Sequence, residues 1–230
     1  ASACRRRYGA KIRTDEMAHD SALRLLMATV ARTAATHDRC IIPLLSSWDS
    51  HHIRVSVKVR RSIQAANELE EQLGWRVAMP TSEELQASCE AGLHPQGSEG
   101  SQPFCLLPYS HPVRRNDRRI SGPLWTGPLF DQDVLESMTV ERATELCGED
   151  AEVAVRHWVG EAELASVPTL IITDMLPKFC EVTGPPKMAD LVAGLKDAGY
   201  KAAVARWGAP AIRTDAPWTV VLEVTEGCFN

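Results

Sequence analysis

The sequence lacks several features that would assign it at once to a class of protein. No apolar run approaches the roughly 20 residues that a membrane-spanning helix needs, and the basic start is not followed by the apolar stretch of a secretory signal. There is no Ser-His-Asp set, no paired-carboxylate arrangement and no P-loop. Hydrolase and kinase functions therefore have no support, and we expect no membrane partner.

The seven cysteines do not indicate a disulfide framework. Their number is odd, and no two stand at the Cys-x-x-Cys spacing of many zinc and redox sites. Disulfide scaffolds are typical of small secreted chains rather than of chains of this length. We expect reduced, mostly buried thiols, no metal site, and a cytoplasmic or nuclear protein.

Charge is distributed unevenly along the chain, whose net charge is -5. Residues 1–61 carry 12 lysines and arginines against 5 acidic residues, whereas residues 62–230 carry 13 against 25. Such asymmetry indicates that the N-terminal part meets a polyanion, although a solvated basic surface gives the same pattern. The acidic residues are concentrated in 131–163, with ten of them against two arginines.

The first sixty residues predict a helix and a pair of strands. Apolar residues at i, i+3 and i+4 spacing predict a helix over 15–37, with Thr14 as its cap. A short apolar run over 40–47 and strict alternation over 52–60 are typical of strands. Pro43 indicates a sheet edge or a bulge. Together the two strands predict an antiparallel hairpin.

The middle of the chain carries weaker signals. We expect a helix over 61–74 that ends with Gly74 as its C′ residue. Residues 75–120 show no sustained period and are rich in Gly, Pro, Ser and Gln, which is typical of a linker or a mobile insertion. Within them, Thr81 is expected to cap a short helix.

The last part of the chain begins with the rigid, apolar stretch GPLWTGPLF at 122–130. Two acidic helices are expected at about 131–147 and 151–165, and a third over 185–199. A β-ribbon is expected over 200–217. Helix, helix, ribbon is the order of a winged helix, which binds nucleic acid as often as protein.

Five blocks of the sequence resemble a known family when they are taken in order. They are RRYGA at 6–10, HDSALRLLMATVARTAATHDRCIIPLLS at 19–46, HHIRVSVKVRRS at 51–62, GPLWTGPLFD at 122–131, and LKDAGYKAAVARW with IRTDAPW between 195 and 218. Together they are similar to the later part of the tRNA (guanine-26)-N2-dimethyltransferases. The resemblance covers most of the chain outside 75–120.

This resemblance implies a fold and a domain organisation. We expect an α/β plus α+β chain: the C-terminal portion of a Rossmann-like class I methyltransferase domain over 1–74, and a family-specific, winged-helix-like tRNA-binding domain over 119–230. Residues 75–118 would be a flexible linker or insertion. The stretch at 122–130 would be the ordered entry into the second domain, fixed by Trp125 and Phe130. The implied partners are tRNA and an upstream methyltransferase segment.

The chain also departs from the family pattern. The glycine loop that binds S-adenosylmethionine and the catalytic Asp-Pro-Phe-Gly segment are not in this sequence. Many relatives have Asp-His-Tyr where this chain has Ser50, His51 and His52, and eukaryotic relatives often pair cysteines near the position of Cys89 and Cys105. We therefore expect no catalytic, cofactor-binding or metal residue here, and S-adenosylmethionine to bind the full-length family enzyme but not this chain alone.

Cations on the predicted elements are the candidate contacts to RNA. A strand face that presents several cations suits phosphate, although such a face can also be covered by a helix and paired with acids. The candidate residues are Arg6, Arg7, Lys11, Arg13, His51, Arg54, Lys58, Arg60, Arg206 and Arg213. Arginines in the insertion, at 114, 115, 118 and 119, are either phosphate contacts or part of a solvated linker. Trp207 is either a stacking platform for RNA or a core residue.

Three functional interpretations stay open. The first is part of a tRNA guanine dimethyltransferase, and the second is a non-catalytic tRNA- or RNA-binding module. The third is a protein-interaction domain, which the acidic segment 131–163 favours.

Overall fold

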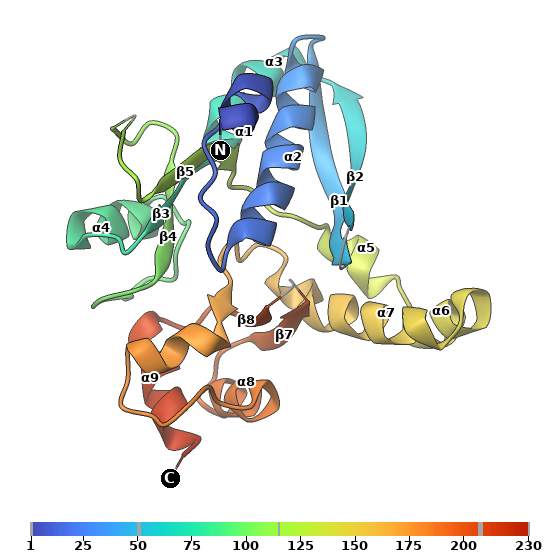
Figure 1. Cartoon of the computed structure of the whole chain (residues 1–230). Helices are drawn as coiled ribbons and strands as arrows, with labels where there is room; N and C mark the ends of the chain where they lie inside the picture. The colour runs from blue at the N-terminus through green and yellow to red at the C-terminus, as the bar shows by residue number, and fades with distance from the viewer. Residues whose placement is uncertain (1, 50–51, 115, 207–208, 230) are drawn as a thin grey trace.

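The computed structural model describes residues 2–49, 52–114, 116–206 and 209–229 of the chain. Within these ranges the strands form three small antiparallel sheets, with helices packed between and around them (Figure 1). Four residues singled out in the sequence, Ser50, His51, Arg115 and Trp207, lie outside the described ranges. No helix in the described part of the chain is long and apolar enough to cross a membrane.

The N-terminal elements agree with the predicted helix and hairpin. After the short helix α1 (Ser2–Tyr8), α2 (Ala18–Ala35) packs on the antiparallel strands β1 (Arg39–Asp49) and β2 (His52–Arg61). The pairing register shifts between Pro43 and Leu45, so the expected bulge is confirmed. The expected cap is wrong: the N–H of Met17 donates to the carboxylate of Asp15 at 3.1 Å, and Thr14 caps nothing.

The predicted helix over 61–74 is shorter than expected. It divides into α3 (Ile63–Asn67), capped by Ser62, and a 3-10 turn η1 (Leu69–Gln72), after which β3 (Leu73–Ala78) begins. Gly74 is therefore a strand residue and not a helix C′ residue. A Cβ at Gly74 would lie 2.1 Å from the carbonyl oxygen of Leu107, so the glycine permits close approach of the neighbouring strand.

Residues 75–118 are not the structureless linker that their composition indicates. They contain most of β3, the helix α4 (Ser82–Glu90) and the strand β4 (Phe104–Pro108), and β3 pairs with both β4 and β5 (Ile120–Trp125). Thr81 caps α4 as expected, in a capping box with Glu84. The predicted boundaries at 74 and 119 thus fall within or at the edge of paired strands of one sheet, because β3 pairs with β5, whose residues stand 43 to 52 positions further along the chain.

The C-terminal part begins with acidic helices, as predicted, although they are divided differently. These are α5 (Gln132–Glu136), α6 (Val140–Cys147), α7 (Glu149–Glu161) and the turn η2 (Ala162–Leu164). Figure 1 shows α6 and α7 projecting to one side of the body.

The rest of the chain forms a small sheet with two helices. The short strand β6 (Ile171–Ile172) is followed by the turn η3 (Thr173–Lys178) and α8 (Met188–Asp197). The predicted ribbon is present as β7 (Ala202–Arg206) and β8 (Pro210–Thr214), and α9 (Trp218–Gly227) follows it. Because β8 also pairs with β6, the sheet has the order β6-β8-β7. The assignment of this part of the chain as a winged helix stays a prediction.

One apolar cluster joins α2, the hairpin, β3 and β8. It includes Met27 of α2, Ile41 of β1, Leu73 of β3 and Ala211 of β8. The side chains of Trp125 and Phe130 are buried in the same core, as expected for the 122–130 stretch. The indole N–H of Trp125 donates to the carbonyl of Pro128 at 2.8 Å, which satisfies its polar end.

Candidate nucleic-acid interface

The outer face of the hairpin carries exposed cations. In β2, Ile53, Val55 and Val57 pack toward the core, so the intervening side chains face solvent. Arg54, Lys58 and Arg60, which we call the hairpin cations, are exposed, and they take part in no ion pair between described residues. In the described part of the chain no helix covers this face with acids, so the structure favours an open cationic surface over the paired alternative.

The open end of the hairpin adds further positive charge. Arg39 of β1 stands directly opposite Arg61 of β2 in the register, and both side chains are exposed. Like charges at directly opposed positions destabilise a strand pair. An anionic ligand would relieve this repulsion, and phosphates of nucleic acid are such a ligand.

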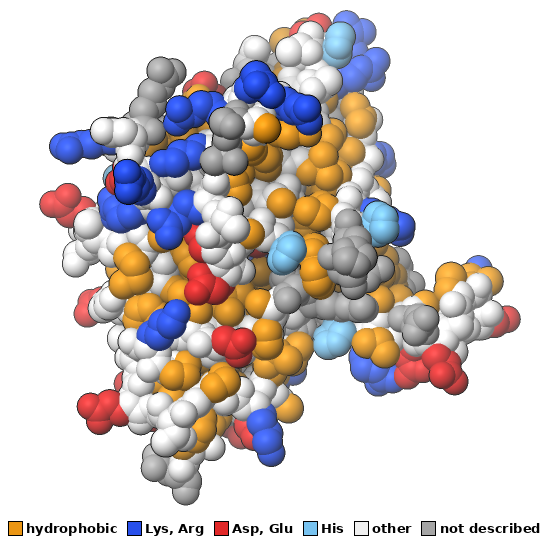
Figure 2. All heavy atoms as spheres, in the orientation of Figure 1, with side chains coloured by type: hydrophobic (Ala, Val, Ile, Leu, Met, Phe, Trp, Pro, Cys, Tyr) orange, Lys and Arg blue, Asp and Glu red, His pale blue; other side chains and the backbone are white. Residues whose placement is uncertain are grey.

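A second basic surface lies on the other side of α2, where the segment that follows α1 contacts the loop 109–119 (Figure 2). We call this the junction surface. Its exposed arginines are Arg5, Arg6, Arg7, Arg114 and Arg118. Arg114 and Arg118 come from the segment that the sequence indicates to be either a phosphate contact or a solvated linker.

The side chains of two candidate residues on this surface bind the protein's own backbone. Lys11 Nζ donates to the carbonyl of Asp117 at 2.6 Å, and Arg13 Nη1 donates to the carbonyl of Arg118 at 2.7 Å. Arg13 Nε also pairs with Asp15 at 3.0 Å. Lys11 and Arg13 therefore hold the loop, while Arg6 and Arg7 remain exposed.

The candidates near the ribbon are placed differently from the prediction. Arg213 is 1% exposed, and its Nε donates to Glu161 Oε2 at 3.1 Å while its Nη1 donates to the carbonyl of Val167 at 2.6 Å. A side chain in this position cannot reach RNA, so its assignment as a contact is wrong. Arg206 ends β7, but its side chain, like His51, lies outside the described part of the chain.

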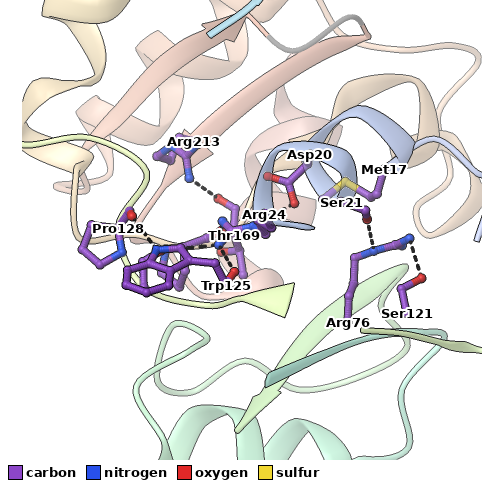
Figure 3. A network of polar contacts seen from close by, with 12 residues as sticks. Met17, Asp20, Ser21, Arg24, Arg76, Ser121, Trp125, Pro128, Thr169 and Arg213 are labelled. Carbon is purple, nitrogen blue, oxygen red and sulfur yellow. Dashed lines mark hydrogen bonds and ion pairs between the residues drawn. The ribbon is translucent and has the colours of Figure 1, made fainter. Parts of the chain in front are cut away.

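Sequence reasoning missed a buried polar network between α2, the β4-β3-β5 sheet and the C-terminal part (Figure 3). Arg24 is fully buried; it pairs with Asp20 at 2.9 Å and donates to the carbonyls of Trp125 and Pro168. Burial lowers the pKa of Arg24, and the Asp20 carboxylate offsets part of that effect. An aspartate four residues before an arginine in a helix was the signal for this pair.

A second buried arginine belongs to the same region. Arg76 of β3 donates Nη1 and Nη2 to both carboxylate oxygens of Asp15, at 3.1 and 3.0 Å, and Nε to Ser21 Oγ at 2.8 Å. Its guanidinium also lies over the ring of Phe104, 4.9 Å from the centroid. The network is structural, because Arg24 and Arg76 each bind segments that are distant in sequence.

A narrow cleft borders this network but does not form a nucleoside site. It is lined by Asp20, His94, Gln102, Phe104 and Trp218, among others, and its volume is about 40 Å³. Ligand pockets for drug-sized molecules are commonly about 300–1,000 Å³. Among the described residues, no three of the types that bind metals gather at a metal-binding distance.

The described residues offer two exposed cationic surfaces on a mixed α/β framework, a pattern typical of nucleic-acid-binding proteins. The model of the N2,N2-dimethylguanosine tRNA methyltransferase family matches residues 1–226. The chain belongs to this family.

Individual relatives agree with the family match. The chain is 31% identical over 228 residues to the tRNA (guanine(26)-N(2))-dimethyltransferase of Aeropyrum pernix, covering 97% of this chain and 52% of the relative. It is 27% identical over 230 residues to the enzyme of that name from Schizosaccharomyces pombe, covering 96% and 42%. The chain thus spans about half the length of the curated relatives that it matches.

A solved structure has the same fold. It is a complex of Trm1 from Pyrococcus horikoshii with S-adenosyl-L-methionine, and it matches with a TM-score of 0.73 at 24% identity. The match covers 97% of this chain and 54% of the other. The mixed α/β arrangement with small sheets is therefore one that this family uses.

Proposed function

We propose that this chain is the tRNA-holding half of a tRNA (guanine-26)-N2-dimethyltransferase. The observation that carries the proposal is the exposed row of hairpin cations in a chain of this family. Phosphate contacts fix the position of an RNA without reading its sequence. The hairpin would hold the tRNA backbone while the base is presented to the methyl donor by an upstream methyltransferase segment.

The described residues do not fit S-adenosylmethionine. All of their strand pairs are antiparallel, whereas open α/β folds bind cofactors at the carboxyl ends of parallel strands. The sequence also has no glycine loop and no Asp-Pro-Phe-Gly segment. We therefore assign the donor and the catalytic groups to the upstream segment and derive no chemical step from this chain.

The functional division follows from this assignment. Residues 1–74 would complete the catalytic domain, and residues 119–230 would be the C-terminal tRNA-binding domain. Residues 75–118 contribute most of β3 and the whole of β4 to the sheet that also contains β5. They would therefore hold the two parts in a fixed relation, and would not act as a free linker.

Binding to tRNA at several salt concentrations tests the proposal. The affinity of the purified chain for tRNA should fall as salt rises. The logarithm of the association constant should decrease with the logarithm of the salt concentration, with a slope of roughly 0.7 to 0.9 per phosphate contact. Charge reversal by Arg54→Glu with Lys58→Glu should weaken binding to different tRNAs alike. Glu145→Lys with Glu149→Lys is the control, because both glutamates are exposed on the acidic helices, and it should leave binding unchanged or stronger.

A protein-interaction role is the second candidate. On the projecting acidic helices Leu146 is 68% exposed and Val153 53% exposed, as an apolar contact with a partner would require. If the chain binds no tRNA even at low salt, the RNA proposal is wrong and this second function is favoured.

A further inference from the structure

We propose that the junction surface is a second RNA-backbone site, in which Arg114, Arg118 and the arginines of α1 contact phosphates and Tyr8 stacks on an unpaired base. The inference rests on the proposed function, because it takes RNA as the ligand. Lys11 and Arg13 are positioning residues in this site and do not themselves touch RNA.

Backbone bridges hold the two segments of the site together. The N–H of Lys11 donates to the carbonyl of Gly122 at 2.8 Å, and the N–H of Gly122 donates back to Lys11 at 2.7 Å. The side chains of Lys11 and Arg13 then bind the carbonyls of Asp117 and Arg118. The arginine loop is thereby fixed against the segment that follows α1.

An arginine clamp fixes the other side of the loop. Arg119 donates to both oxygens of Glu84, at 2.8 and 3.0 Å, and to Asp117 Oδ2 at 2.8 Å. Burial alone would raise the pKa of Glu84, but the hydrogen bonds from Arg119 and Thr81 outweigh it and lower that pKa. The nearby acids are thus already neutralised by Arg119, and they are not available to the exposed arginines.

The remaining arginines of the junction surface have no acidic partner among the described residues. Arg5, Arg6, Arg7, Arg114 and Arg118 are exposed and enter no ion pair between described residues. Figure 2 shows blue side chains gathered in this region of the surface. A solvated surface tolerates such charges one at a time, whereas a cluster on a fixed loop repels itself and favours a polyanion.

Tyr8 adds an aromatic group to the cationic cluster. The residue is 44% exposed, although aromatic rings favour burial. Its carbonyl accepts a hydrogen bond from Arg32 Nη2 at 2.9 Å, so α2 fixes its backbone. Single-stranded RNA is bound by this combination of stacking aromatics and backbone cations. An anionic membrane offers the same phosphate chemistry but no base to stack on.

Salt-dependent tRNA binding by paired variants of the chain tests the site. Arg114→Glu with Arg118→Glu should weaken binding at least about tenfold and lower the salt slope by about 1.4 to 1.8. The matched control is Arg142→Glu with Arg156→Glu, which makes the same charge change at exposed positions of α6 and α7, and it should leave the slope unchanged. Tyr8→Ala should weaken binding, and Tyr8→Phe should retain it.

Lys11 is tested by rescue. Lys11→Met should weaken tRNA binding, and a melting curve should show that the variant is still folded at the temperature of the assay. Lys11→Arg keeps a donor for the Asp117 carbonyl and should restore tRNA binding. If Lys11→Arg fails to restore binding, the positioning role is wrong.

Three outcomes separate this inference from the proposed function. If the Arg114 and Arg118 changes have no effect while the hairpin variant loses affinity, the junction site is wrong and the tRNA-holding function stands. If neither variant changes binding, both fail. If the junction variants abolish binding to vesicles of anionic phospholipid but not to tRNA, the surface is a membrane site and the inference is overturned.

Discussion

Arg76 and Asp15 form a two-pronged ion pair in the interior, with N–O distances of 3.1 and 3.0 Å. The arginine comes from the central strand of the second sheet, and the aspartate comes from the segment that leads into α2. Asp15 also accepts the N–H of Met17, the residue before α2, so one carboxylate contacts both the segment that leads into the helix and the sheet. This contact fixes the relation between the two surfaces that we assign to RNA.

Breaking this pair should be costly. Arg76→Met leaves a carboxylate that is 7% exposed without its main partner, and removal of one member of a buried pair typically costs about 3–5 kcal/mol. Urea unfolding should show this loss. Arg156→Met removes an exposed pair with Glu152 and should cost no more than about 1 kcal/mol. Equal losses would contradict the structural role of Arg76.

Two glycines should respond oppositely to alanine. Gly74→Ala places a methyl group against the Leu107 backbone, which is not a flexible side-chain end, so it should destabilise the chain by at least about 2 kcal/mol. Gly160, inside α7, has nothing within 4 Å of an added Cβ. Gly160→Ala should stabilise by about 0.5–1 kcal/mol. A Gly74→Ala variant that melts at or above the temperature of the parent chain would refute the pairing of β3 with β4 at this point.

Stability should depend on pH through His94. Burial lowers the pKa of His94, and its contact with Gln102 offsets only part of that effect. In the unfolded chain a histidine titrates near about 6.5, so the unfolded state binds the proton first as pH falls. The contribution of neutral His94 to the free energy of unfolding is therefore fully present above that pH. It is lost as the pH falls toward the lowered pKa of His94 in the folded state, at up to about 1.4 kcal/mol per pH unit.

His94→Phe removes this titration. Free energies of unfolding between pH 8 and pH 5 should fall less steeply in the variant than in the parent chain. Parallel pH profiles would show that the His94 ring is not enclosed as the structure places it.

The local elements were predictable where the signal was local. The alternation over 52–60 and the apolar spacing over 15–37 require no distant partner, and β2 and α2 formed close to the predicted ranges. Pro43 marked its bulge for the same reason, because its missing N–H constrains the strand at that residue.

The failures came from contacts between distant residues. β3 and β4 are short and buried on both faces, with Arg76 interrupting the apolar run, so no period of two was visible. Arg213 appeared to be a ribbon cation because its partner Glu161 stands 52 positions earlier. The inward use of Lys11 and Arg13 likewise depends on carbonyls more than 100 residues away, which no spacing rule connects.

Parallel titrations of the purified chain with tRNA and with S-adenosylmethionine test the central claim most directly. If this chain is the tRNA-holding half of the enzyme, it should bind tRNA with an affinity that falls with salt and that is weakened by Arg54→Glu with Lys58→Glu. It should show no binding of S-adenosylmethionine and no methyl transfer to tRNA. Binding of the methyl donor, or methylation above a donor-free control, would contradict the account, as would an absence of tRNA binding at low salt.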